Sequence, residues 1–275
     1  MVTARILITG AAGRVGTFLR SRLAAEGRVL RLLDIAELPA AAEGENVEIV
    51  QATLTDMATM EAATRDVDAV IHLGGYSLEE SWDKILHVNI DGTHTVLEAA
   101  RRSGVRRVVL ASSNHAVGYV ERANGTAGDY LFPRPDTYYG VSKVAKEALG
   151  SLYADRYGMD VIALRIGSCF EKPLDVRMLA SWLSPDDCAR LCEACLSVPS
   201  PGFRVVWGVS ANKRGWFSLD EARALGYEPQ DDSETYAPEV LARDGELDPS
   251  SYAAKYVGGA WCGPDFDTAA KEAGR

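Results

Sequence analysis

The sequence has few basic residues and no long apolar run, and both shortages exclude classes of function. Lysine and arginine total 29 against 39 acidic residues, which gives a formal net charge of -10. Binding to a phosphate backbone requires clustered lysine and arginine, so we expect no nucleic-acid partner. No apolar run approaches the roughly 20 residues that a membrane-spanning helix needs, so we expect no membrane association.

Cysteine is also scarce, with five residues in a chain of 275. An odd count in a chain of this size fits reduced thiols better than a disulfide framework. The apolar, strand-like run Arg5–Thr9 is reached without the charged stretch, apolar core and cleavage site of a secretory signal. The sequence therefore predicts a cytoplasmic protein.

Strand-like segments rich in β-branched residues alternate with helical patterns as far as Ile166. This alternation is typical of α/β proteins with a doubly wound, Rossmann-type parallel sheet covered by helices on both faces. The expected strands are Arg5–Thr9, Val29–Leu33, Glu48–Gln51, Ala69–Leu73, Arg107–Ala111, Val161–Ile166 and Phe203–Trp207, and the expected helices are Val15–Ala25, Met57–Thr64, Trp82–Ser103, Tyr139–Tyr157 and Ser218–Leu225.

The regularity weakens in the C-terminal third of the chain. Ser184 and Pro185 start a further helix there, as an N-cap serine followed by a proline at the first helical position. We expect one integrated domain, in which residues 1–166 form the core and residues 167–275 mainly form a small annex and a C-terminal tail. The annex is expected to close over the carboxyl edge of the sheet.

Glycines recur at intervals of three where the first strand becomes a helix, at Gly10, Gly13 and Gly16. The first permits a tight turn, the second lets the backbone approach a pyrophosphate, and the third lets helix and strand pack closely. A merely flexible turn is the alternative, but the position after the first strand favours a dinucleotide. Arg14 and Val15 lie inside this turn, where a cation can contact a phosphate.

Asp34 ends the second expected strand, about 20 residues beyond the glycines. An acid at this position accepts hydrogen bonds from the adenosine ribose hydroxyls and repels the additional phosphate of NADP. The sequence therefore favours NAD over NADP. Ile35, the residue after Asp34, is expected to be a further contact of the cofactor. A turn or capping aspartate is the alternative role.

Tyr139 and Lys143 are four residues apart, so on a helix they share one face. A phenol with a reference pKa of about 10 becomes an effective base at neutral pH only when its phenolate is stabilised, and a neighbouring ammonium contributes to that. A surface pair is the alternative. It is less favoured because the strand ending at Ser113 lies about 25 residues earlier and ends at the edge where ligands bind such sheets. We expect catalytic roles for Tyr139, Lys143 and Ser113.

These motifs resemble the extended short-chain dehydrogenase/reductases and, more narrowly, the uronate dehydrogenase family. The narrower resemblance rests on His72-Leu73-Gly74-Gly75, Ser77, Ser112-Ser113-Asn114-His115, Arg134-Pro135-Asp136, Tyr139-Gly140-Val141-Ser142-Lys143, Arg165-Ile166-Gly167-Ser168-Cys169, Arg177-Met178-Leu179 and Val205-Val206-Trp207-Gly208. It runs from residue 5 to about residue 216, with a weaker similarity at Gly258-Gly259.

The resemblance implies that NAD accepts a hydride from C1 of D-glucuronate or D-galacturonate and that an aldarolactone is released. Tyr139 is the implied base. The residues that match nucleotide contacts, in addition to the glycine turn, Asp34, Tyr139 and Lys143, are Leu73, Gly74, Gly75, Asn89, Ile166, Ser168 and Cys169. Those that match substrate contacts are Ser77, Ser113, Asn114, His115, Tyr139 and Arg177. Where the family has an Asp-Leu pair against the adenine, this sequence has Thr53-Leu54.

Arg177 offers a planar fork for the carboxylate of a hexuronate, with a surface salt bridge as the alternative. Arg165 competes for that role, but it lies in an expected strand and is predicted to pair internally. His115 is expected to bond the substrate, with a purely structural histidine as the alternative. We also expect a homo-oligomer and no metal.

Two competing functions are a nucleotide-sugar epimerase or dehydratase and an NAD-sensing regulator without activity. The compact C-terminal third speaks against the first, and the intact tyrosine–lysine pair against the second. Cys188, Cys192 and Cys195 have the spacing of an iron–sulfur motif. Because they lie on one apolar face of a well-capped helix, we interpret them as core residues.

Overall fold

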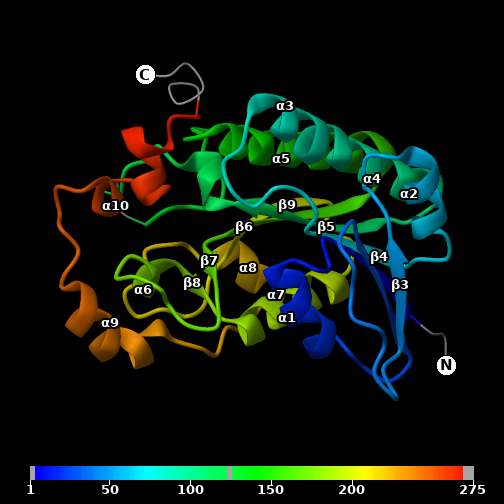
Figure 1. Cartoon of the computed structure of the whole chain (residues 1–275), viewed down its shortest axis with the longest axis horizontal. Helices are drawn as coiled ribbons and strands as arrows, with labels where there is room; N and C mark the ends of the chain where they lie inside the picture. The colour runs from blue at the N-terminus through cyan, green and yellow to red at the C-terminus, as the bar shows by residue number, and fades with distance from the viewer. Residues whose placement is uncertain (1–3, 123–125, 269–275) are drawn as a thin grey trace.

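A seven-stranded parallel sheet forms the centre of the computed structural model, which describes residues 4–122 and 126–268 (Figure 1). The strand order is β3-β2-β1-β4-β5-β6-β9, so the order reverses between β1 and β4. The strands are β1 Ala4–Thr9, β2 Arg28–Asp34, β3 Val47–Gln51, β4 Ala69–His72, β5 Arg107–Ser113, β6 Asp160–Ile166 and β9 Phe203–Gly208, and the pair β7 Ser168–Cys169 and β8 Trp182–Leu183 forms a second small sheet. The predicted doubly wound fold is confirmed.

Helices cover both faces of this sheet, α1 and α7 on one and α2, α4 and α5 on the other (Figure 1). Their bounds are α1 Arg14–Arg22, α2 Met57–Thr64, α4 Gly92–Arg102, α5 Tyr138–Tyr157 and α7 Pro185–Ser197. The shorter helices are α3 Trp82–Lys84, α6 Met178–Ser181, α8 Asp220–Ala224, α9 Ala237–Asp244 and α10 Tyr252–Lys255. Within the described residues, no helix combines the length and the apolar character that crossing a membrane requires.

The helix expected over Trp82–Ser103 is present from Trp82 to Arg102, but its middle part is not α-helical. A π-helical segment, Ile85–Asp91, separates α3 from α4. Such wider turns occur often at functional sites, and this one places Asn89 in the interior at 2% exposure. An apolar pattern does not distinguish an α turn from a π turn, so the interruption was not predicted.

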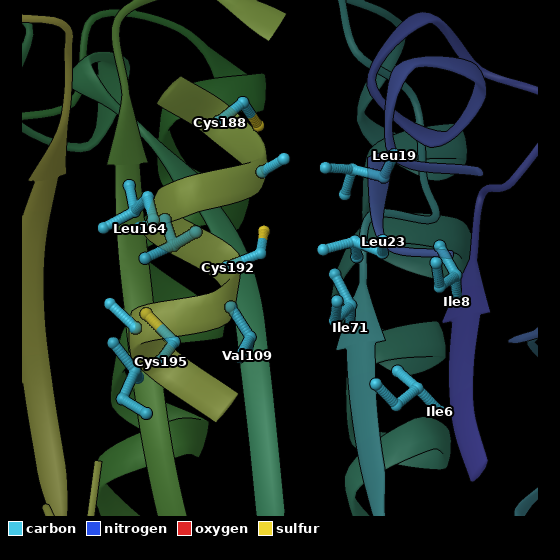
Figure 2. Packing of buried hydrophobic residues seen from close by; sticks show 14 of the residues in the cluster. Ile6, Ile8, Leu19, Leu23, Ile71, Val109, Leu164, Cys188, Cys192 and Cys195 are labelled. Carbon is cyan, nitrogen blue, oxygen red and sulfur yellow. The ribbon is translucent and has the colours of Figure 1, made fainter. Parts of the chain in front are cut away.

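The helix α7 starts as predicted, because the Ser184 hydroxyl accepts a hydrogen bond of 2.9 Å from the Asp187 N–H. Cys188, Cys192 and Cys195 project from its inner face into the core (Figure 2), and each is at most 1% exposed. Their interpretation as packing residues is confirmed. Among the described residues, no group of three or more histidine, cysteine or acidic side chains is arranged to hold a metal ion.

One apolar cluster joins the first and last parts of the chain. It contains Ile8 and Leu19 from the N-terminal elements together with Leu191 and Tyr227 from beyond residue 166. All four side chains are fully buried. Part of the C-terminal third therefore completes the core, while the remainder lies beside the carboxyl ends of the central strands (Figure 1).

Candidate functional site

The glycine turn between β1 and α1 has no room for a side chain at Gly10 or Gly16. Gly10 has a φ of +72°, and a Cβ atom there would lie 2.7 Å from the Gly74 nitrogen. A Cβ atom on Gly16 would lie 2.6 Å from the Ala11 Cα. The turn thus packs directly against the loop that follows β4, as the glycine spacing predicts.

The N-terminus of α1 is open to an anion. Its N-cap, Gly13, makes no side-chain cap bond, and the first turn contains no acid. Among the described residues, no acceptor bonds the N–H groups of Arg14, Val15 and Gly16. The Arg14 guanidinium lies 3.9 Å from the ring centroid of Phe170, which holds this cation beside the turn. These groups fit the pyrophosphate of a dinucleotide.

Asp34 lies at the end of β2, and its carboxylate bonds the glycine turn. It accepts hydrogen bonds of 2.9 Å from the Ala12 N–H and 3.0 Å from the Ala36 N–H. Each oxygen keeps a further lone pair, so the turn role does not compete with binding of a ribose hydroxyl. The strands β2 and β3 end side by side at Asp34 and Gln51. Just beyond these ends lie two exposed residues, Ile35 at 72% exposure and Thr53.

Gly74 and Gly75 line the loop after β4, directly after Leu73. A Cβ atom on Gly74 would lie 2.4 Å from a methyl carbon of Leu54, which packs beneath the loop. Asn89 holds the next residue, Tyr76, by accepting from its N–H at 2.7 Å and donating to its carbonyl at 3.0 Å. It also donates to the Ser142 hydroxyl at 3.1 Å. The Asn89 amide therefore ties this loop to α5.

Beneath this loop His72 is fully buried between two hydroxyl groups. Its ring nitrogens lie 2.7 Å from Thr9 Oγ1 and 3.1 Å from Thr93 Oγ1. Burial holds the pKa of His72 well below its ordinary value, with the Lys146 and Lys143 charges adding to that effect. The ring is neutral and structural, and it braces the carboxyl ends of β1 and β4.

Tyr139, Lys143 and Ser113 converge at the carboxyl end of β5. Burial raises the pKa of the Tyr139 phenol to about 12, while a hydrogen bond with Ser113 acts in the opposite direction. Burial lowers the pKa of Lys143 to about 8, and the Glu147 carboxylate opposes that change. The Lys143 ammonium donates to the Ala111 carbonyl at 2.9 Å and lies 4.9 Å from the Tyr139 ring centroid. The three residues predicted to be catalytic are thus neighbours.

A buried ion pair braces this cluster from behind. Arg165 donates to both carboxylate oxygens of Glu147, at 2.9 and 2.8 Å, and is 2% exposed. The Ser112 hydroxyl donates to the same carboxylate at 2.6 Å. Arg165 therefore pairs internally, as predicted, and Glu147 joins β5, α5 and β6.

Glu79 is a functional residue that the sequence gave no reason to select. Its two carboxylate oxygens accept from the N–H groups of Tyr138 and Tyr139, at 3.1 and 2.7 Å. A carboxylate is favoured at a helix N-terminus because it satisfies free N–H groups and complements the helix dipole. Glu79 thus holds the start of α5, but it lies 60 residues from Tyr139 in the chain.

The last described segment contributes a second missed residue, Trp261. Its ring stacks on His115 with centroids 4.1 Å apart and meets Tyr139 edge-on at 5.7 Å. Phe266 also stacks on Trp261, with ring centroids 5.0 Å apart. The segment around Trp261 therefore lies against the site, whereas the sequence suggested only Gly258-Gly259 there.

Arg177 reaches the same place from the annex. It donates to the Val257 carbonyl at 2.5 Å, and Asn114 donates to the same oxygen at 3.0 Å. Its side chain lies against Gly259, where a Cβ atom would meet Arg177 Nε at 2.4 Å. Within the described chain, Nε has no hydrogen-bond partner and no ion pair involves this guanidinium. The alternative of a surface salt bridge is wrong.

The remaining predicted residues lie on the loop after β4, at the end of β6 beside Ser113, and on β7. Ser77 is exposed on the loop after β4. Ile166 ends β6, and the Ser168 hydroxyl lies 3.0 Å from that of Ser181. Cys169 is 5% exposed and packs in the core cluster.

Comparison with known proteins gives consistent matches over nearly the whole chain. The model of the NAD dependent epimerase/dehydratase family matches residues 6–172. A uronate dehydrogenase of Pseudomonas putida is 43% identical over 259 residues, which are 94% of this chain and 95% of that protein.

Solved structures agree with that comparison. A crystal structure of a mutant uronate dehydrogenase from Agrobacterium tumefaciens in complex with NAD is 39% identical, with a TM-score of 0.89 and coverage of 94% of this chain and 97% of that one. Glucuronic acid dehydrogenase from Chromohalobacter salexigens is 42% identical, with a TM-score of 0.90 and coverage of 96% and 99%.

Proposed function

The chain belongs to the NAD dependent epimerase/dehydratase family, and from that premise we propose that it is a uronate dehydrogenase. It oxidises D-glucuronate or D-galacturonate at C1 to the aldarolactone, with NAD as the hydride acceptor. The observation that carries this assignment is the position of Arg177, a guanidinium without a carboxylate partner among the described residues. Arg177 and Asn114 donate hydrogen bonds to the same Val257 carbonyl oxygen. Asn114 directly follows Ser113, the proposed catalytic serine.

The residues divide the reaction among them. Arg177 binds the substrate carboxylate, which places the sugar with C1 toward Tyr139. Ser113 bonds the reacting hydroxyl, and Tyr139 removes its proton. In the protein alone the phenol is neutral, since its pKa is about 12. NAD, when bound, supplies the hydride acceptor and a positive charge that favours the phenolate, to which the Lys143 ammonium adds.

The cofactor is held at the switch in strand order between β1 and β4, where ligands bind doubly wound sheets. We assign the pyrophosphate to the N-terminus of α1 and Arg14, and the adenosine ribose to Asp34. Residues 1–166 thus bind NAD, while residues 167–275 mainly complete the substrate site. Asn89 contributes by holding the loop after β4, because its amide already bonds protein groups.

The protein is further proposed to be a cytoplasmic homo-oligomer that acts on a small molecule and binds no nucleic acid. Its five cysteines are free and buried, as expected where thiols stay reduced. Large apolar side chains stay exposed on α3, the π segment and α5, among them Trp82 at 40% and Leu152 at 49%.

The test is to mix the protein with NAD and either hexuronate and to follow NADH absorbance. We expect absorbance to rise with at least one of the two acids. The Tyr139→Phe variant should lose turnover, by roughly a thousandfold or more, and still bind NAD, because only the proton acceptor is removed. Turnover of a UDP-sugar with neither acid oxidised would favour an epimerase or dehydratase, and an active Phe variant would refute the assigned base.

A further inference from the structure

Asp136 lies directly beneath His115, and its side chain is 0% exposed. Three glycines from separate segments enclose the carboxylate. Cβ atoms on Gly118 and Gly258 would lie 2.1 and 1.9 Å from its Oδ2, and one on Gly140 would lie 3.0 Å from its Oδ1. No side chain fits at these positions while the carboxylate stays in place. The surrounding backbone is thus shaped to hold this one group.

The hydrogen bonds around Asp136 have a defined direction. The Thr137 hydroxyl accepts from the Gly140 N–H at 3.1 Å, so its own proton is directed to Asp136 Oδ1, also at 3.1 Å. Asp136 Oδ2 lies 2.6 Å from His115 Nδ1. A carboxylate only accepts hydrogen bonds, so Nδ1 carries the proton and donates it.

The His115 ring is also held in its plane. Trp261 stacks on it at 4.1 Å, with an angle of 26° between the rings, and Tyr139 meets it edge-on at 5.7 Å. The His115 side chain is 12% exposed. Among residues 4–122 and 126–268, no protein group bonds its Nε2. One ring nitrogen is therefore committed to Asp136, and the other is available to a ligand.

We propose that Asp136 is a positioning residue that acts through His115. By accepting from Nδ1 it selects the tautomer of the neutral ring in which Nε2 carries the free lone pair, so that Nε2 accepts a hydrogen bond from a hydroxyl of the sugar acid held against Tyr139. This inference rests on the proposed function and extends it to a residue without any contact to substrate. It assigns His115 the role of a hydroxyl acceptor, distinct from the cationic role of Arg177.

The first test is the Asp136→Asn variant, which has nearly the same volume. Its amide can present N–H to Nδ1, which shifts the histidine to the tautomer that donates from Nε2. We expect kcat/KM for the hexuronate to fall roughly tenfold to a hundredfold, with the Kd for NAD and the Tm unchanged. The Asp186→Asn variant, an exposed carboxylate paired with Arg22 on α1, is the matched control and should behave as wild type.

A double-mutant cycle separates positioning from a structural role. If Asp136 acts through the imidazole, adding Asp136→Asn to the His115→Ala variant should cause no further loss of kcat/KM. Losses that multiply would overturn the proposal, as would an Asp136→Asn variant with wild-type kcat/KM.

Nitrogen NMR of the wild-type protein tests the same proposal at the imidazole itself, with Asp136 in place. The His115 resonances, assigned with the His115→Gln variant, should show a protonated Nδ1 and an unprotonated Nε2. A protonated Nε2 at neutral pH would overturn the proposal. Failure of the proposed function is a different outcome, in which the wild type oxidises no hexuronate although the tautomer is as predicted.

Discussion

At the scale of single residues, the site contains a buried lysine whose positive charge lowers the stability of the folded protein. Lys143 has a pKa of about 8 instead of its ordinary 10.5, because its ammonium is removed from water. The unfolded chain therefore binds more protons than the folded chain between these values, and stability rises with pH across that window. Below about pH 8 the buried charge has its full destabilising effect on the fold. Above about pH 10.5 the lysine is neutral in both states, and the effect is absent.

The Lys143→Met variant should accordingly be more stable than wild type at pH 7, by up to about 3 kcal/mol, and inactive. Urea unfolding at pH 7 and at pH 10 checks this, since the difference should shrink at the higher pH. Lys84→Met, a change at an exposed lysine that pairs with Glu80, should show no such dependence. An equal gain at both pH values would show that packing, and not charge burial, is responsible.

At the scale of elements, α5 carries Tyr139 and Lys143, the proposed catalytic pair, on one face. Its first turn is fixed by Thr137, which accepts from Gly140, and by Glu79, which accepts from Tyr138 and Tyr139. The loop after β4 and the start of the catalytic helix are thereby one connected unit. Disturbing that loop should move the base.

The Glu79→Ala variant should lose about 1 kcal/mol of stability, since two N–H groups lose their acceptor. We also expect kcat to fall several-fold because the Tyr139 backbone is no longer held. The neighbouring Glu80→Ala change removes only an exposed pair with Lys84 and should leave both quantities near wild type. Measurement of kcat and of thermal unfolding on both variants decides this, and equal behaviour of the two would contradict the assigned role.

At the scale of the whole molecule, the N-terminal and C-terminal parts share one core. Ile8 and Leu19 pack in the same cluster as Leu191 and Tyr227, and all four are excluded from water (Figure 2 shows the first two). Truncation after residue 166 would expose the face of the sheet that α7 covers. The C-terminal part therefore supplies core residues that the N-terminal part packs against.

We predict that the full chain unfolds in a single transition, and that residues 1–166 alone do not reach the native state. Far-UV circular dichroism and tryptophan fluorescence should give coincident curves in urea. All five tryptophans lie beyond residue 81, and three of them beyond residue 206, so fluorescence reports mainly on the C-terminal part. Two separated transitions, or a soluble fragment with native dichroism, would contradict one integrated domain.

Local patterns predicted the elements because their causes are local. The Ser184 cap, the run of α2 over Met57–Thr64 and the strand end at Asp34 each depend on neighbouring residues, and the structure has them as predicted. The helix expected over Trp82–Ser103 is present, but local patterns did not predict its π segment, whose Asn89 bonds Tyr76 of the preceding loop and Ser142 of α5.

The sequence by itself determined the doubly wound fold, the glycine turn and the Tyr139–Lys143 pair, because each follows from the order of elements along the chain or from the spacing of residues close together in it. Only the tertiary structure decided that Glu79 caps the catalytic helix, that Trp261 covers His115 and that Asp136 lies buried beneath it. These contacts join residues far apart in the chain. Their existence depends on how the elements pack, for which short-range patterns carry no signal.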